Sequence, residues 1–210
     1  AQLLEQELDE NSLKEYTQII INEADRLQNL MNRMLTPHQM PVYKKTNIHE
    51  ILERVRSLIL SEFSTDITFI RDYDVSLPEF IMDREKLIQA ILNIARNGAQ
   101  AMKLNNQDDM KLSFITRAER QIVFRKKKHA TAIRIDIVDN GPGIKNELID
   151  KIFFPLVTGN ENGSGLGLSL AQNLISLHQG MIDCHSVPGN TVFSIILPIE
   201  NNLIPTKEKK

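Results

Sequence analysis

Two glycine clusters in the second half of the chain constrain its fold more than any other feature. They read DNGPG at residues 139–143 and GSGLGL at residues 163–168. Glycine lets backbone N–H groups approach an anion closely because no Cβ intervenes, and a helix beginning directly after such a loop turns its positive end towards that anion. Single glycine-rich turns are common. Two of them around an acidic residue favour a nucleotide pocket with a movable lid, in which phosphate is the anion.

The composition is that of a globular chain without a marked charge. Of the 210 residues, 41% are hydrophobic and 25% charged, which is enough for one full domain and a smaller element. The net charge of −2 gives no reason to expect nucleic acid as a partner. Cys184 is the only cysteine, so no internal disulfide can form, which favours a reducing compartment and hence the cytoplasm. No apolar run approaches the roughly 20 residues of a membrane span.

A proline-containing linker separates two patterns along the chain. Residues 12–35 carry apolar side chains at steps of three and four, which predicts one long amphipathic helix that ends before Pro37. Residues 1–8 resemble the last turns of a preceding helix. We therefore expect residues 1–38 to be a partial helical hairpin that forms a homodimer through residues 12–35. The alternative is that the apolar stripe covers the core of its own domain.

Residues 39–200 have a mixed pattern and form the second expected domain, followed by a disordered tail over residues 201–210. Helices are predicted at residues 48–60 and 84–103, the second after an Asp83 N-cap, and strands at residues 67–71, 80–82, 111–116, 121–124, 131–138, 181–185 and 191–197. This order predicts an α+β fold, a two-layer α/β sandwich in which helices cover one face of a mixed sheet.

Three polar side chains stand out near the glycine clusters. Asn93 and Asn97 are four residues apart and share one face of their helix. Two amides bonded to a neighbouring strand would be the ordinary explanation, but an amide oxygen also suits a Mg²⁺ that contacts substrate phosphates. Asp139 ends an apolar strand, where ligands bind in such sheets, and its carboxylate can accept a hydrogen bond from a purine amine. The alternative for Asp139 is a capping role in a glycine turn.

In this order and spacing, the motifs resemble the N, G1, F and G2 boxes of the histidine-kinase ATP-binding domain, a member of the GHKL fold family that includes gyrase and MutL. They are Asn93-x-x-x-Asn97, Asp139-x-Gly141-x-Gly143, Phe153-Phe154-Pro155 and Gly163-x-Gly165-x-Gly167. The segments EADRL at residues 23–27 and FPLVTG at residues 154–159 are similar to the sensor kinases of nitrogen regulation. The similarity extends from residue 1 to about residue 199.

The resemblance implies that ATP and Mg²⁺ are the cofactors and that Asn93 and Asn97 are catalytic. Asn97 would coordinate the metal, Asn93 would support the phosphates, and residues 144–164 would form the lid. Asp139 and Gly143 would hold adenine. The implied ATP-binding residues are Asn93, Asn97, Asp139, Gly141, Gly143, Ile144, Gly163, Gly165, Leu166, Gly167, Leu168 and Thr191.

Two positions depart from the family pattern. Asn160 stands where relatives of this type usually carry a lid Arg, so a positive charge near the γ-phosphate would be missing. Gly98 replaces the usual Ala after the second Asn, which costs roughly 1 kcal/mol of helix stability. Either change could reduce activity.

The phospho-accepting His of the family lies on the helix of which we expect only residues 1–8 to remain. The chain is therefore not expected to phosphorylate itself. His49 begins a segment like the acceptor motif but lacks the basic-Asn-Pro run that follows it there, and we interpret it as a surface helix residue. The remaining histidines show no metal spacing and are expected to be structural or exposed; they are His38, His129, His178 and His185.

The resemblance implies the ATP-binding catalytic core of a two-component sensor histidine kinase. It would transfer the γ-phosphate of ATP to a His on the upstream helix and then to an Asp of a response regulator of the NtrC type, with a PII-like signalling protein as a further candidate partner. One alternative, an ATP-hydrolysing switch of the same fold, is disfavoured because such proteins carry Glu where Asn93 stands, and an amide cannot act as a general base. The other is a protein-binding module that uses nucleotide to order its lid. The basic run at residues 125–128 is interpreted as a solvated hairpin tip, with nucleic-acid binding as a minor alternative.

Overall fold

The computed structural model describes residues 41–63, 67–124, 127–159 and 164–199. The chain divides into two compact units, Ala1–Met40 and Pro41–Lys210, and all described residues belong to the second. The expected dimer helix over residues 12–35 and the expected tail over residues 201–210 therefore lie outside the described residues. Among the helices that are described, none is long and apolar enough to cross a membrane.

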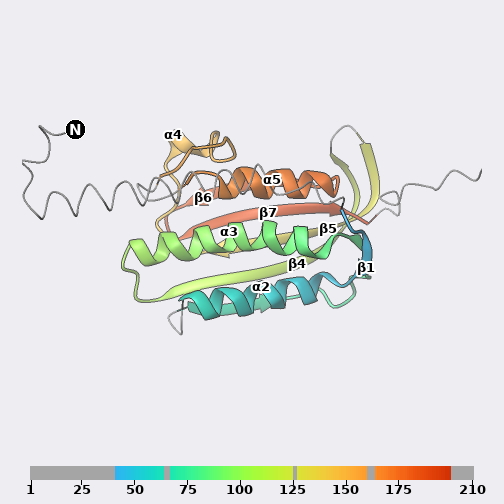
Figure 1. The fold of residues 1–210 in the computed structure, drawn as a ribbon, viewed down its shortest axis with the longest axis horizontal. Helices are drawn as coiled ribbons and strands as arrows, with labels where there is room; N and C mark the ends of the chain where they lie inside the picture. The colour runs from blue at the N-terminus through green and yellow to red at the C-terminus, as the bar shows by residue number, and fades with distance from the viewer. Residues whose placement is uncertain (1–40, 64–66, 125–126, 160–163, 200–210) are drawn as a thin grey trace, which may run out of the picture. The chain divides into compact units, whose positions relative to one another are not determined.

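The second unit is a two-layer sandwich in which helices cover one face of a five-stranded sheet (Figure 1). The strand order is β2-β4-β5-β7-β6, and only β2 and β4 pair in parallel. The predicted sandwich of helices on one face of a mixed sheet is thus confirmed. The sheet consists of β2 (Ile67–Asp72), β4 (Met110–Phe124), β5 (Lys127–Asp139), β6 (Met181–Val187) and β7 (Asn190–Pro198), covered by α2 (Ile48–Phe63), α3 (Arg84–Leu104) and α5 (Gly167–Leu177).

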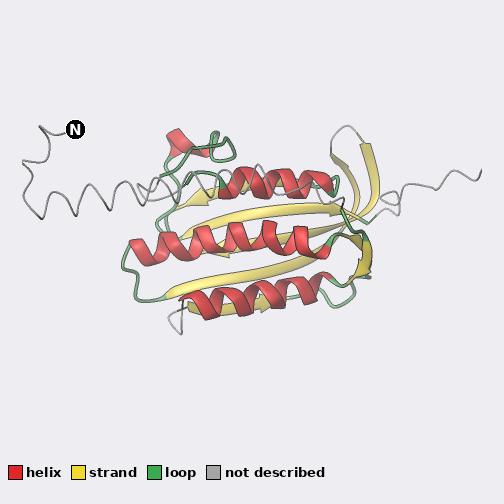
Figure 2. Cartoon of the chain, in the orientation of Figure 1, coloured by secondary structure: helices red, strands yellow, loops and turns green. Residues whose placement is uncertain are grey.

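Two short elements and one long strand differ from the sequence expectation (Figure 2). A separate strand β1 (Lys44–Thr46) pairs antiparallel with β3 (Phe80–Met82), and a single-turn helix α4 (Asn146–Ile149) follows β5. The two strands expected at residues 111–116 and 121–124 are one strand, β4. Residues 117–120 between them are half-buried or exposed on both faces of the strand and so carry no apolar alternation, but their pairing with β5 continues the strand.

The helices form where capping residues and apolar spacing agree. Asn47 caps α2 by accepting a hydrogen bond from the His49 N–H at 2.9 Å. Asp83 caps α3 as predicted, with its Oδ1 accepting from the Lys86 N–H at 3.1 Å, which satisfies one of the free N–H groups of the first turn. Apolar side chains at steps of three and four then pack onto the sheet; on α2 they are Ile48, Ile51, Leu52, Val55, Ile59 and Phe63.

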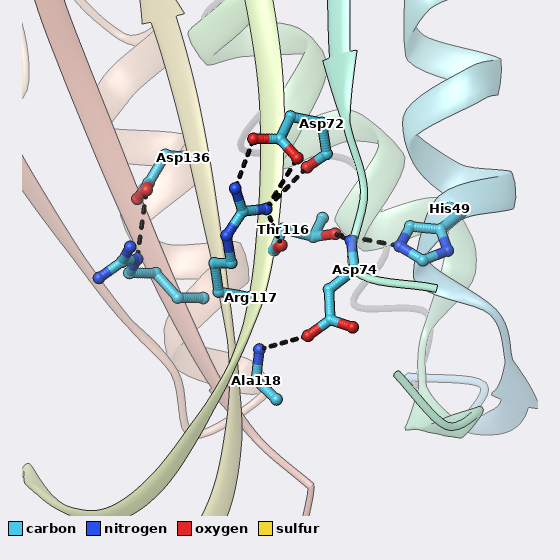
Figure 3. A network of polar contacts seen from close by, with 8 residues as sticks. His49, Asp72, Asp74, Thr116, Arg117, Ala118 and Asp136 are labelled. Carbon is cyan, nitrogen blue, oxygen red and sulfur yellow. Dashed lines mark hydrogen bonds and ion pairs between the residues drawn. The ribbon is translucent and has the colours of Figure 1, made fainter. Parts of the chain in front are cut away.

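The edge strand β2 is tied to β4 by polar contacts on and beside the sheet (Figure 3). Arg117 of β4 forms an ion pair with Asp72 at the end of β2. The hydroxyl of Thr116 accepts a hydrogen bond from the Asp74 N–H at 2.9 Å, and the Asp74 Oδ2 accepts from the Ala118 N–H at 3.2 Å. These bonds hold the chain that leaves β2 against the neighbouring strand.

His49 takes part in the same network and is half-buried, in contrast to the surface position expected from the sequence. Its Nε2 lies 3.1 Å from the hydroxyl of the buried Thr116 (Figure 3). Its ring stacks on Tyr73 with the centroids 4.7 Å apart. Burial lowers the pKa of His49, although Asp74 and Glu53 oppose the shift. The position is explained by the packing of the β2 end onto the first turn of α2, a contact between segments that are distant in the sequence.

His178 joins three elements at the end of α5. It is 2% exposed, its Nδ1 lies 2.8 Å from the Leu174 carbonyl, and its Nε2 accepts from the Asp83 N–H at 3.0 Å. The ring of Tyr43 packs edge-on against it, while the Tyr43 hydroxyl donates to the Leu177 carbonyl at 3.0 Å. Burial lowers the pKa of His178. The neutral ring with the proton on Nδ1 satisfies both neighbours.

We expect His178 to make folding sensitive to mild acid. Because its pKa is lowered in the folded state, the unfolded chain binds a proton first, and stability is lost as the pH falls below the ordinary value of 6.5. The free energy of unfolding should fall by up to about 1.4 kcal/mol per pH unit in this window. Denaturant unfolding between about pH 7 and pH 5.5 measures the slope. The slope of the unfolding free energy against pH should be smaller in His178→Gln and unchanged in His185→Gln, whose side chain is exposed. Equal slopes in the two variants and the unmodified chain would contradict the prediction.

Candidate functional site

The predicted site residues that are described lie where β5 ends, where β7 begins and where α5 begins. Asp139 is the last residue of β5 and pairs in register with Thr191 of β7. The side chain of Asn97 on α3 lies beside Gly167, the first residue of α5, where a Cβ would be 3.7 Å from its Oδ1. In Figure 1 the short helix α4 and the turns around it lie at this end of the sheet, next to the start of α5.

Asp139 presents a buried carboxyl group at the end of its strand. It is 6% exposed, and its Oδ1 accepts a hydrogen bond from the Gly141 N–H at 2.9 Å. Burial raises the pKa of Asp139, and the Gly141 N–H opposes the shift. A carboxyl group that is removed from water in this way gains more from a hydrogen-bond donor of a ligand than an exposed one does.

The first glycine turn packs against the turn between β6 and β7. Gly143 has a φ of +82°, and a Cβ there would lie 2.9 Å from the Pro188 nitrogen. The Gly189 N–H donates to the Gly141 carbonyl at 2.8 Å. Gly143 is therefore required both by its backbone conformation and by the close approach of a neighbouring backbone.

A polar chain links this turn to β6 and β7. The Ser186 hydroxyl accepts a hydrogen bond from the Ile144 N–H at 2.9 Å and lies 2.8 Å from the hydroxyl of the buried Thr191. Sequence reasoning identified Ile144 and Thr191 but not Ser186. The signal that could have found it is the hairpin register, since Ser186 pairs directly with Thr191.

The other half of the site has features that suit an anion and its cation. The Asn93 Nδ2 is buried and has no hydrogen-bond partner within the described chain, an arrangement that calls for a partner from outside. Leu166 occupies the N-cap of α5 and provides no side-chain cap, so the first N–H groups of that helix, around Gly167 and Leu168, remain available to a negative charge. With the Asn97 amide oxygen as a hard ligand, these residues fit the phosphates of a nucleotide with Mg²⁺.

The second glycine cluster contacts the turn that follows Phe153. Gly165 has a φ of +63°, and a Cβ there would lie 2.5 Å from the backbone carbon of Leu156. Leu156 itself has a φ of 67°, and its N–H donates to the Gly165 carbonyl at 2.9 Å. Phe153 is anchored edge-on against Phe193 of β7. Of the predicted lid over residues 144–164, residues 160–163 lie outside the described residues, and they include Asn160 and Gly163.

We expect Gly165→Ala to destabilise the protein more than Gly189→Ala. Both glycines have a positive φ, but a Cβ at Gly189 would meet no described atom within 4 Å, whereas one at Gly165 would collide with Leu156. The loss in the free energy of unfolding should be about 1 kcal/mol for Gly189→Ala and about 2 kcal/mol for Gly165→Ala. Denaturant unfolding measures both values. Equal losses would show that the contact with Leu156 contributes nothing.

A family model described as histidine kinase-, DNA gyrase B-, and HSP90-like ATPase matches residues 82–201. The chain belongs to this ATPase family. The matched region begins at the last residue of β3 and includes both asparagines and both glycine clusters. The family and the fold that the motifs predicted are thereby confirmed.

The comparisons with individual proteins agree with this assignment. The sensory histidine kinase/phosphatase NtrB of Vibrio alginolyticus is 49% identical over 199 residues, which cover 95% of this chain and 56% of the relative. The chain therefore spans little more than half the length of that protein. Among solved structures, the catalytic domain of the histidine kinase ThkA has a TM-score of 0.61 at 23% identity, with 78% of this chain and 99% of that chain covered. ThkA in complex with the response regulator TrrA has a TM-score of 0.64 at 24% identity, with 94% and 55% covered. At these identities the two structures show the shared fold.

Proposed function

We propose that the chain is the ATP-binding catalytic core of a sensor histidine kinase of the NtrB type. The observation that carries the proposal is the joint placement of Asn97 beside the uncapped start of α5 and of buried Asp139 beside Thr191. Asn97 and the free N–H groups at the start of α5 suit a metal-bound triphosphate. Asp139 and Thr191 suit a purine. The whole reaction transfers the γ-phosphate of ATP to a His, and from there to an Asp of a response regulator.

The residues of the chain would act by binding and orienting ATP. The Asp139 carboxylate would accept a hydrogen bond from the exocyclic amine of adenine, with Gly141, Gly143, Ile144 and Thr191 around the base. Mg²⁺ held by Asn97 would neutralise charge on the phosphates.

The phosphate end would be held in place by donors of the chain. The orphaned amide of Asn93 and the first N–H groups of α5 would hold the phosphate oxygens, with Gly163, Gly165, Leu166, Gly167 and Leu168 forming the loop and helix start. An imidazole nitrogen can then attack phosphorus in line as the bond to the β-phosphate oxygen breaks and ADP leaves.

The catalytic core would act together with a second copy of the chain and with other proteins. We infer that residues 1–38 contribute to a homodimer through residues 12–35, that a response regulator of the NtrC type receives the phosphate, and that a PII-like protein regulates it. A cytoplasmic location would suit such partners. The resemblance to NtrB over 95% of the chain supports these assignments.

Nucleotide titration followed by phosphotransfer tests the proposed function. Calorimetry should show Mg²⁺-dependent ATP binding. Radiolabel from the γ-phosphate should then pass to a His on the acceptor helices of the Vibrio alginolyticus relative, supplied as a separate polypeptide. Steady release of inorganic phosphate without labelled acceptor would instead identify an ATP-hydrolysing switch, and binding without either reaction would identify a nucleotide-ordered binding module. Acid-labile label on His49 of the chain itself would contradict the role given to the separate acceptor.

A further inference from the structure

The hydroxyl group of Ser186, on β6, contacts two parts of the candidate site at once. Its oxygen accepts a hydrogen bond from the Ile144 N–H at 2.9 Å and lies 2.8 Å from the hydroxyl oxygen of Thr191. Ile144 belongs to the turn after β5, and Thr191 is the residue of β7 that pairs in register with Asp139. Ser186 therefore connects the first glycine turn to the residue beside the buried carboxyl group.

The donors and acceptors give this chain of hydrogen bonds a direction. A hydroxyl group has one proton to donate and two lone pairs that accept. The Ser186 oxygen already accepts the proton of the Ile144 N–H, and a hydroxyl that accepts a hydrogen bond becomes a better donor. In the cooperative arrangement the Ile144 N–H donates to Ser186 and the Ser186 O–H donates to Thr191. The proton of the Thr191 hydroxyl then remains for a further acceptor.

A purine with an exocyclic amine offers such an acceptor next to Asp139. Residues directly opposite each other in an antiparallel pair share one face of the sheet, with Cβ atoms about 4.5–5.5 Å apart, and both Asp139 and Thr191 are buried. They present an accepting carboxylate and a donating hydroxyl side by side. Adenine presents the complementary pair on one edge, the amine and the ring nitrogen N1. Hypoxanthine and guanine present the reverse, a carbonyl oxygen and an N–H.

We infer that Ser186 is a positioning residue for base recognition, which makes the Thr191 hydroxyl a donor towards N1 of adenine. Loss of the Ser186 hydroxyl would leave the Thr191 O–H free to rotate, without the bond that polarises and orients it. This inference rests on the proposed function, because it names a determinant of base choice within the same site.

Two analogues of ATP test the two halves of the base edge separately. 1-Deaza-ATP has a C–H in place of N1 and keeps the amine, whereas purine riboside triphosphate lacks the amine and keeps N1. Calorimetry with Mg²⁺ should show that the unmodified chain binds ATP about fivefold more tightly than 1-deaza-ATP, since loss of one neutral hydrogen bond has roughly that effect. Ser186→Ala should reduce this preference to about twofold or less. The preference for ATP over purine riboside triphosphate, which depends on Asp139, should stay unchanged.

A second serine of the same sheet provides the matched control. The Ser194 hydroxyl on β7 donates to the Asp136 carboxylate at 2.8 Å, but Ser194 is three residues from Thr191 in the strand and its side chain lies on the opposite face. Ser194→Ala should leave the affinities for all three nucleotides unchanged. Ser186 is half-buried, so removal of its hydroxyl should likewise leave the fold intact.

A double variant tests whether Ser186 acts through Thr191. Thr191→Val removes the hydroxyl and keeps the branched shape of the side chain. Adding Ser186→Ala to Thr191→Val should then cause no further loss of ATP affinity, because the group that Ser186 orients is already missing.

Three results would each overturn the inference. They are a fivefold preference over 1-deaza-ATP that persists in Ser186→Ala, an equal fall in both preferences, and a further loss of ATP affinity in the double variant. Equal binding of ATP and 1-deaza-ATP by the unmodified chain would also overturn the inference and leave the proposed function intact. Failure of the unmodified chain to bind ATP would instead overturn the proposed function.

Discussion

Replacing Asn97 by Ala should lower the rate of phosphoryl transfer to a separate acceptor by about 100-fold or more, because a metal that neutralises phosphate charge contributes several kcal/mol to the transition state. The structure places the Asn97 amide next to Gly167, at the uncapped start of α5. The fold should persist, since the side chain is only half-buried. Single-turnover transfer of labelled γ-phosphate at saturating ATP measures the rate.

A neighbouring substitution provides the control for Asn97→Ala. Arg96→Ala removes the adjacent side chain of α3, whose ion pair with Glu62 is partly exposed, and solvent-exposed pairs contribute little to stability. The transfer rate of this variant should stay close to that of the unmodified chain. If Asn97→Ala also retained its rate and its dependence on Mg²⁺ concentration, Asn97 would not be the metal ligand.

Replacing Asp139 by Asn should weaken the binding of adenine nucleotides by about 10- to 150-fold, the equivalent of the 1.5 to 3 kcal/mol that a hydrogen bond to a charged group contributes. The substitution keeps the size of the side chain in the narrow space between Gly98 and Gly141. It replaces one carboxyl oxygen by an N–H₂ group, which cannot accept a hydrogen bond from the base. Calorimetric titration with ADP and with ATP measures the loss.

Asp136→Asn is the matched control for this prediction. Asp136 belongs to the same strand, but its side chain accepts a hydrogen bond from the Ser194 hydroxyl at 2.8 Å and pairs with Arg134. Figure 3 shows Asp136 among the polar groups of the sheet, on the strand beside Arg117. Nucleotide affinity should be unchanged in this variant. Unaltered binding in Asp139→Asn as well would remove Asp139 from the adenine site.

Local sequence signals were sufficient for most of the fold. Asp83 sits before an apolar period and caps α3, and the residues around Pro188 form the expected hairpin between β6 and β7. Strand β1 was missed because Lys44–Thr46 is too short and polar to carry an alternating pattern, and it is held by pairing with β3. The sequence therefore predicted the features that depend on contacts between residues close together in the chain, such as helix caps and hairpin turns.

The candidate site was predicted less completely because its parts meet only after folding. The motifs identified Asn97, Asp139 and Thr191 one by one, but not the bond between Ser186 and Thr191. Gly98 appeared in the sequence only as a loss of helix stability. Gly98 and Asp139 are far apart in the chain, and the spacing of apolar residues within a helix or a strand cannot predict a contact between two such elements.

The helix α5 has consequences beyond the nucleotide site, because its two ends meet different parts of the unit. Its first residue, Gly167, lies beside Asn97, and its last turn carries the carbonyl that binds the Tyr43 hydroxyl, near the start of the described unit. Eleven helical residues span about 16 Å, so α5 directly connects the Asn97 contact to the Tyr43 contact. If a ligand shifted α5 as one body along its axis, the carbonyl that binds Tyr43 would shift with it, and the coupling between the two ends would be reciprocal.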